Sequence, residues 1–297
     1  MRSWLVEVGA RLILATRFID KSYRVIDRAR STLVLALASD AVLVRFNSLA
    51  YGGDQTYQPE SPTFRRYMFP WEEKVVATYF PPPPARVLIG GAGGGREVLA
   101  LVEMGYEVVA FEPSASLTAA LAGRFANRLN ARVYRASYED MPRLFPARPG
   151  EPFGSLETEP DFDAAILGWQ SFSHLRTEEQ RIRTLSSFAH HVRGPILISF
   201  CQLAFHERTP GRRWTDSVRR MLKIGPGDRF SVYIGFTHDL STSELKTIAE
   251  QAGLCIEHLN EVGRDTNWPH AVLCRLDLAG QNKAQAEISD VSLSADP

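Results

Sequence analysis

The chain has 297 residues, a formal net charge of zero and a pI near 7.1. Its length suits one large domain or two small ones. The hydrophobic content of 44% and charged content of 23% exclude a chain that is disordered, collagenous or coiled-coil throughout. A zero net charge provides no whole-molecule attraction to nucleic acid, so we expect no nucleic-acid partner.

The sequence predicts a cytoplasmic protein without a membrane span or a metal site. The longest run without a charged side chain, Gly194–His206, is shorter than the roughly 20 residues that a spanning helix needs. Near the N-terminus, Glu7 and Arg11 interrupt the apolar stretch that a signal peptide requires. The cysteines lie far apart in the chain and without CxxC spacing, which is typical of a reducing compartment. They are Cys201, Cys255 and Cys274.

The first part of the chain, residues 1–75, begins with a helical pattern. Its apolar positions are Leu5, Val8, Leu12, Ala15, Ile19, Tyr23, Ile26, Leu33 and Leu37. Residues 1–30 also hold seven Lys or Arg against three Asp or Glu, so the polar face is cationic. The pattern fits a helix that packs on a core and exposes a solvated polar face. It also fits a helix that binds a membrane surface or a partner, and the sequence leaves both interpretations open.

Beyond the prolines at 81–84, strand patterns alternate with helical patterns. Strands are predicted at residues 86–90, 107–112, 132–137, 161–169 and 194–201. Helices are predicted after the first strand, over 117–129, from a capping box at Thr177 and Gln180, and from another at Ser241 and Glu244. This alternation implies a parallel sheet wrapped by helices. Two further strands, at 255–262 and 270–276, predict a terminal antiparallel hairpin.

A glycine-rich turn after the first strand carries the chemical signal. Gly91, Gly93 and Gly95 have the spacing G-x-G-x-G, and Glu112 ends the next predicted strand. In a doubly wound sheet this places a carboxylate beside the glycine turn, where it can accept hydrogen bonds from both hydroxyls of a ribose. No register fits GxGxxG, and no P-loop lysine is present, so a nicotinamide oxidoreductase and a P-loop enzyme are disfavoured.

Four ordered motifs extend this signal along the chain. They are VLIGGAGGGREV, VVAFEP, ASYEDMP and FDAAILGWQSFSHL, followed by the late helix pattern STSELKTIAEQAGL. With these motifs the chain resembles the class I S-adenosylmethionine-dependent methyltransferases from near Val87 to Leu276. The resemblance implies an α/β fold with a doubly wound, mostly parallel seven-stranded Rossmann-like sheet and an antiparallel last strand. We expect residues 1–75 to form an N-terminal helical or irregular cap. Residues 76–277 would be the methyltransferase domain with an insertion at 202–240, and 278–297 a flexible polar tail.

The resemblance also implies which residues bind S-adenosylmethionine. The turn residues Gly91, Ala92, Gly93 and Gly95 would line the methionine and ribose, and Glu112, followed by Pro113, would hold the ribose hydroxyls. At the adenine edge the family usually has an acidic residue followed by a small one, whereas this chain has Ser137 and Tyr138. The adenine amino group would then be bound by Glu139 or Asp140.

A second departure concerns the methionine amino group. Many members have an acidic residue at the end of the first strand, where this chain has Ile89. The amino group then needs another anchor, for which the candidates are Glu97 and the backbone carbonyls near Leu167 and Gly168.

The acceptor side is less determined by the sequence. Methyl transfer from a sulfonium mainly requires that two reactants be positioned, and a base is needed only if the nucleophile carries a proton. His174 and His206 follow the fourth and fifth strands and are candidate catalytic bases, although each could instead bond backbone. We expect residues 48–80 and the insertion to cap the site, with Trp71 or Tyr79 near the cofactor.

These features predict methyl transfer to the oxygen or nitrogen of a small molecule. The alternatives are an RNA or protein methyltransferase, supported only by the basic stretches 1–30 and 208–223, and a non-catalytic protein that binds S-adenosylmethionine. The basic insertion is equally suited to a substrate lid, a solvated surface or the contact of a homodimer.

Overall fold

A computed structural model describes most of the chain. It covers residues 11, 22–23, 25–53, 57–58, 60–62, 67–145, 162–203, 212–261 and 268–276, with the side chains of 52 and 212–215 left aside. The predicted tail at 278–297 and His206 lie outside the described residues.

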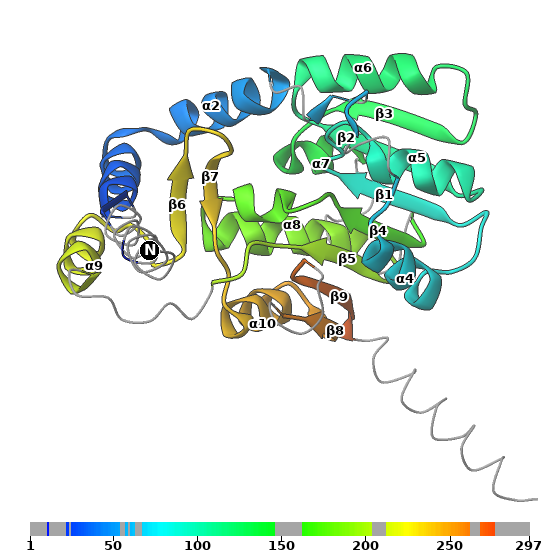
Figure 1. Cartoon of the computed structure of the whole chain (residues 1–297). Helices are drawn as coiled ribbons and strands as arrows, with labels where there is room; N and C mark the ends of the chain where they lie inside the picture. The colour runs from blue at the N-terminus through cyan, green and yellow to red at the C-terminus, as the bar shows by residue number, and fades with distance from the viewer. Residues whose placement is uncertain are drawn as a thin grey trace, which may run out of the picture.

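The core of the structure is a seven-stranded sheet with the order β3-β2-β1-β4-β5-β9-β8 (Figure 1). The strands are β1 (Arg86–Gly90), β2 (Glu107–Glu112), β3 (Ala131–Arg135), β4 (Ala164–Leu167), β5 (Ile196–Ser199), β8 (Leu254–Asn260) and β9 (His270–Arg275). The first five pair in parallel, and β9 runs antiparallel to both of its neighbours, β5 and β8. The predicted doubly wound sheet with an antiparallel last strand is therefore confirmed.

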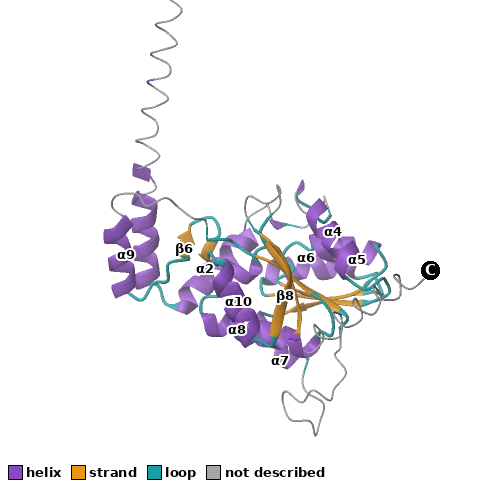
Figure 2. Cartoon of the chain, turned by 90° about the horizontal axis from the view of Figure 1, so that it is seen from below, coloured by secondary structure: helices purple, strands orange, loops and turns teal. Residues whose placement is uncertain are grey.

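Helices cover both faces of this sheet (Figure 2). One layer contains α4 (Pro70–Tyr79), α5 (Arg96–Glu103) and α6 (Ala115–Phe125), and the other contains α7 (Met141–Leu144), α8 (Glu178–His191) and α10 (Thr242–Gln251). Each layer buries its own apolar cluster against the sheet, as near-continuous hydrophobic strands require. The predicted capping box opens α8 at Thr177 with Gln180, and α10 begins at the predicted Ser241, whose side chain accepts a hydrogen bond from the backbone N–H of Glu244 without the reciprocal bond of a full capping box.

A smaller cluster joins the N-terminal segment to the insertion. Residues 25–37 are helical, and α2 (Asp40–Gly53) packs against β7 (Gly235–His238), which pairs with β6 (Asp228–Ser231). The helix α9 (Arg212–Met221) precedes this hairpin, and all of these elements lie at one end of the sheet in Figure 1. They share a small core of Leu35, Leu43, Ile224, Phe230 and Phe236.

The structure differs in two respects from the predicted division of the chain into an N-terminal segment, a sheet domain and an insertion. The sequence boundary at residues 75 and 76 falls inside α4, whose Trp71, Val75 and Val76 are buried against the sheet. The insertion also contains its own helix and hairpin, which form because Phe230 and Phe236 find their apolar partners on the N-terminal helices. Such a partner lies nearly 200 residues away in the chain, so no local pattern reveals it.

Two of the three cysteines lie close together in the fold. Cys255 and Cys274 are distant in sequence, but they face each other on β8 and β9 with their Sγ atoms 2.9 Å apart. Both are free thiols, as is Cys201. The described helices include none that is long and apolar enough to cross a membrane.

Candidate functional site

The glycine turn links β1 to α5 at the carboxyl edge of the sheet. Gly91, Gly93 and Gly95 have φ angles of 66°, 53° and 81°, a left-handed region in which a side chain is strained. Space is equally restrictive at two of these positions. A Cβ at Gly91 would lie 2.7 Å from Ser171 Cβ, and one at Gly95 would lie 2.1 Å from Leu121 Cδ2. Glycine is therefore required by both backbone conformation and close packing.

Glu112 lies beside this turn, as the sequence predicted. Its Oε2 accepts a hydrogen bond from the backbone N–H of Gly93, and its Oε1 accepts one from Ser114, both at 2.9 Å. The side chain is buried, which raises the pKa of the carboxyl group, while the two backbone donors oppose that rise. Each carboxylate oxygen accepts only one of these backbone hydrogen bonds, so both oxygens keep further acceptor capacity. The next residue, Pro113, is exposed.

The residues after β3 form a short 3-10 helix, η2 (Tyr138–Asp140). Asp140 Oδ2 accepts hydrogen bonds from the backbone N–H and the hydroxyl of Ser137, which lowers the pKa of Asp140. Tyr138 donates its hydroxyl hydrogen to the Gly90 carbonyl at 3.0 Å, and Ser171 Oγ lies 2.5 Å from the same hydroxyl. Because the tyrosine hydrogen is used, Ser171 is the donor in that contact. Tyr138 thus supports the glycine turn by packing and hydrogen bonding.

The end of β4 meets the same turn. The Gly168 N–H donates to the Gly90 carbonyl at 2.8 Å, and a Cβ at Gly168 would lie 2.2 Å from the Gly91 carbonyl oxygen. Leu167 is buried immediately before it. Trp169 follows, and its buried indole N–H has no hydrogen-bond partner among the described residues. An unpaired buried donor is costly, so this N–H is a candidate contact for a ligand.

A buried ionic cluster, which the sequence did not predict, connects α4 to α5. Arg96 forms a bidentate pair with Glu72 and also contacts Glu97 Oε1 at 2.7 Å. Burial raises the pKa of Glu72 to about 6 against the lowering effect of Arg96. The guanidinium also lies 4.1 Å from the ring centre of Phe69. Glu97, a predicted anchor for the methionine amino group, also accepts a weak hydrogen bond from the backbone N–H of Trp169 at 3.4 Å.

His174 connects three segments that are distant in sequence. Its Nδ1 lies 2.6 Å from the Phe236 carbonyl oxygen, and its Nε2 lies 2.7 Å from the hydroxyl of Tyr51 on α2. A carbonyl can only accept, so Nδ1 carries the hydrogen and Nε2 accepts from Tyr51. Burial lowers the pKa of His174, which keeps the ring neutral. Burial also raises the pKa of Tyr51, and Cys201 and Glu112 contribute to that rise.

The two aromatic residues expected near the cofactor pack against histidine side chains. Trp71 stacks on His270 with ring centres 4.3 Å apart, and Tyr79 packs on His258 at 5.7 Å. Both histidines belong to the terminal hairpin. The placement of either aromatic residue against a cofactor stays a prediction.

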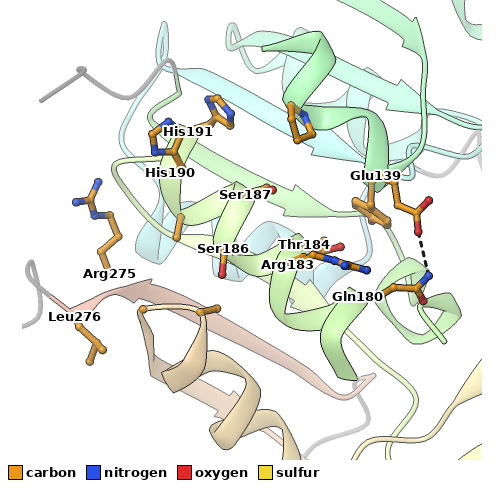
Figure 3. Close-up of a pocket in the computed structure, with 15 residues that line it drawn as sticks. Glu139, Gln180, Arg183, Thr184, Ser186, Ser187, His190, His191, Arg275 and Leu276 are labelled. Atoms are coloured by element: carbon orange, nitrogen blue, oxygen red, sulfur yellow. Dashed lines mark hydrogen bonds between the residues drawn. The ribbon is translucent and has the colours of Figure 1, made fainter. Parts of the chain in front are cut away.

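A separate groove of about 870 Å³ runs along α8 (Figure 3). Glu139 and Gln180 lie at one end, joined by a hydrogen bond of 3.0 Å, and Arg275 and Leu276 lie at the other. Neither Glu112 nor any residue of the glycine turn is among the described residues that line it. Of the residues that the sequence singled out around the cofactor, Tyr138 and Glu139 line this groove.

Known structures share this arrangement of strands and helices. The CcbJ methyltransferase from Streptomyces caelestis superposes with a TM-score of 0.51 at 14% identity, over 77% of this chain and 98% of the other. A SAM-dependent methyltransferase from Methanosarcina mazei gives 0.50 at 12% identity, over 70% and 98%. The chain has the class I methyltransferase fold.

This fold likeness is not accompanied by a sequence match. A third structure, from Rhodobacter sphaeroides and named for Zn-dependent alcohol dehydrogenases, gives a TM-score of 0.53 at 14% identity, over 78% of this chain and 98% of the other. The sequence matches no protein-family model and no curated protein. Among the described residues no group of three His, Cys, Asp or Glu could hold a metal ion. At these identities the likeness establishes the methyltransferase fold, and the chemistry must be argued from the site.

Proposed function

We propose that this chain transfers the methyl group of S-adenosylmethionine to an oxygen or nitrogen of a small molecule. The observation that carries the proposal is the Glu112 carboxylate, held by two backbone amides beside the left-handed glycine turn. Strand order reverses between β1 and β4, and in open α/β sheets ligands bind at the carboxyl ends of the strands at such a point.

The residues at this edge fit the chemical groups of the cofactor. Glu112 would accept the ribose hydroxyls with the lone pairs that Gly93 and Ser114 leave available. The unpaired indole N–H of Trp169 is a donor for a carboxylate, and Glu97 and the Leu167 carbonyl are acceptors for an ammonium group. For the adenine we propose Asp140 and Pro113 as neighbours, with Ser137 and Tyr138 positioning them.

The cofactor supplies an electrophilic methyl group attached to a sulfonium. The acceptor forms a bond to that methyl group as the sulfur–carbon bond breaks, and a hydroxyl or protonated amine acceptor must also lose a proton. We propose His174 as the group that takes up this proton, since it is neutral and its Nε2 already accepts a hydrogen bond. Tyr51 would relay the proton, since its hydroxyl is hydrogen-bonded to Nε2 at 2.7 Å.

Two measurements test the proposal in order. Native mass spectrometry and calorimetric titration of the full chain should detect S-adenosylmethionine or its demethylated product. Transfer of a labelled methyl group to pooled small molecules, with RNA and protein as parallel acceptors, should then label the small-molecule fraction. Absence of cofactor binding would contradict the whole proposal, labelling of RNA or protein alone would contradict the acceptor class, and binding without any transfer would favour a non-catalytic protein.

A further inference from the structure

The helix at residues 25–37 has its polar side turned toward the rest of the protein. Ser31 Oγ accepts a hydrogen bond from the backbone N–H of Phe230 at 2.9 Å, and Thr32 Oγ1 accepts one from Arg219 at 3.1 Å. Arg28 forms an ion pair with α9. These contacts fix the rotation of the helix about its own axis.

The apolar side of the same helix faces solvent. Ile26, Leu33 and Leu37 are 66%, 60% and 77% exposed, and Ala29 and Ala36 are exposed as well. Consecutive helical residues are about 100° apart, so these five side chains form one stripe. The sequence pattern fits a helix whose apolar side packs on a core, yet in the structure the opposite side of the helix contacts the rest of the protein. An exposed apolar stripe of this kind marks an interaction surface.

The stripe belongs to a heptad pattern that begins near the N-terminus. The first position of each heptad is always large and aliphatic: Leu5, Leu12, Ile19, Ile26 and Leu33. The fourth position always holds a smaller residue: Val8, Ala15, Ser22, Ala29 and Ala36. Apart from Ser22 both positions are apolar in every heptad, and such a repeat is typical of the seam of a coiled coil.

The alternation of large and small residues also selects an orientation. In a parallel pair each position faces its own copy, so the small fourth positions would face each other across a gap. In an antiparallel pair each first position faces a fourth position of the other helix, and large side chains fill the space over small ones. Such a seam is complementary to itself under a two-fold axis, which closes the assembly at two copies.

We propose that this stripe is the interface of a homodimer in which the N-terminal helices of two copies pair antiparallel. Over residues 25–37 a membrane surface fits less well, because membrane-surface helices present cations beside the apolar face and the two cations of this stretch are paired within the protein. Here Arg28 is paired inward with α9, and Arg30 is paired with Asp27 on the same helix. The inference does not depend on the proposed methyl transfer.

Sedimentation of the full chain tests the interface. We expect a dimer at about 10 μM, and Leu33→Glu should raise the dissociation constant about a hundredfold or more, since each copy places a charge in the seam. Leu129→Glu is the matched control, because Leu129 is fully exposed after α6 and remote from the stripe. Both variants should keep the wild-type unfolding midpoint when monomeric. A wild-type monomer at that concentration, or a Leu33→Glu dimer of unchanged affinity, would overturn the proposal.

A second variant tests the orientation. Ala29→Leu adds volume at an exposed position of the monomer, so the fold should be unaffected. In an antiparallel pair the new leucine meets a large first-position residue, and we expect at least a tenfold weaker dimer. A tighter dimer would indicate parallel pairing and overturn the antiparallel assignment. A wild-type monomer that co-sediments with vesicles of anionic phospholipid would instead assign the stripe to a membrane surface.

Discussion

Replacing Glu112 by alanine should separate the binding role of this carboxylate from its structural one. In the free protein the substitution leaves the backbone N–H groups of Gly93 and Ser114 without their acceptor. Each backbone donor left without a partner costs about 1–3 kcal/mol. Two effects offset part of this cost: the variant no longer buries a carboxylate, and water can enter the vacated space and accept the hydrogen bonds. We therefore expect a loss of unfolding free energy of about 1–3 kcal/mol, small enough for the domain to stay folded.

The effect on the cofactor is expected to be separate and larger. Hydrogen bonds from the ribose to a charged acceptor contribute about 1.5–3 kcal/mol, so the dissociation constant of S-adenosylmethionine should rise about tenfold to a hundredfold. Calorimetric titration measures the affinity, and denaturant unfolding measures the stability. Glu107→Ala is the control, since Glu107 begins the same strand, is exposed and forms only a 3.7 Å contact with Arg86. Equal cofactor affinity in both variants would refute the ribose assignment.

Three further predictions address the rest of the candidate site and the insertion. Gly93→Val should abolish cofactor binding in calorimetry, because a branched residue is strained at a φ of 53°; retained binding would mean that the turn is not the site. His174→Gln should lower kcat for a hydroxyl acceptor by about 10²–10⁴ with unchanged cofactor affinity, and Tyr51→Phe by less. The lowered pKa of His174 means that the wild-type rate should be flat above about pH 6.5 and fall only under more acidic conditions; a wild-type rate in the Gln variant would exclude the histidine as base. Burial alone would lower the pKa of His238, but hydrogen bonds to two carboxylates on β6 and α10 raise it. Its contribution to stability is therefore complete below about pH 6.5 and lost as pH rises through the higher folded pKa. Urea unfolding between pH 6 and 9 should show this decline in the wild type and a flatter profile in His238→Gln, and parallel profiles would contradict the assignment.

Most strands and helices and the glycine turn beside Glu112 were predictable, because short-range sequence patterns determine them. Buried parallel strands give continuous apolar runs, helix starts carry capping boxes such as Thr177 with Gln180, and a left-handed turn requires glycine at Gly91, Gly93 and Gly95. The position of Glu112 also followed, because the end of one strand and the turn after its neighbour lie at the same edge of a parallel sheet.

Other features of the site depend on contacts between segments that are distant in sequence, and a local sequence pattern does not predict such contacts. The sequence places Glu72 and Arg96 on either side of the proline run, and only the packing of α4 on α5 joins them in a buried pair. Tyr51 and His174 are 123 residues apart and meet because α2 packs against the inserted hairpin.

The N-terminal helix shows most directly what each level determines. Its sequence specifies an apolar stripe and a polar face, because side chains recur with the helical period. Which face turns inward was decided by hydrogen bonds and an ion pair from Arg28, Ser31 and Thr32 to the insertion. A hydrophobic pattern in the sequence predicts that one face of a helix is buried. Only the tertiary structure shows whether that face packs within the same chain or stays exposed for a partner.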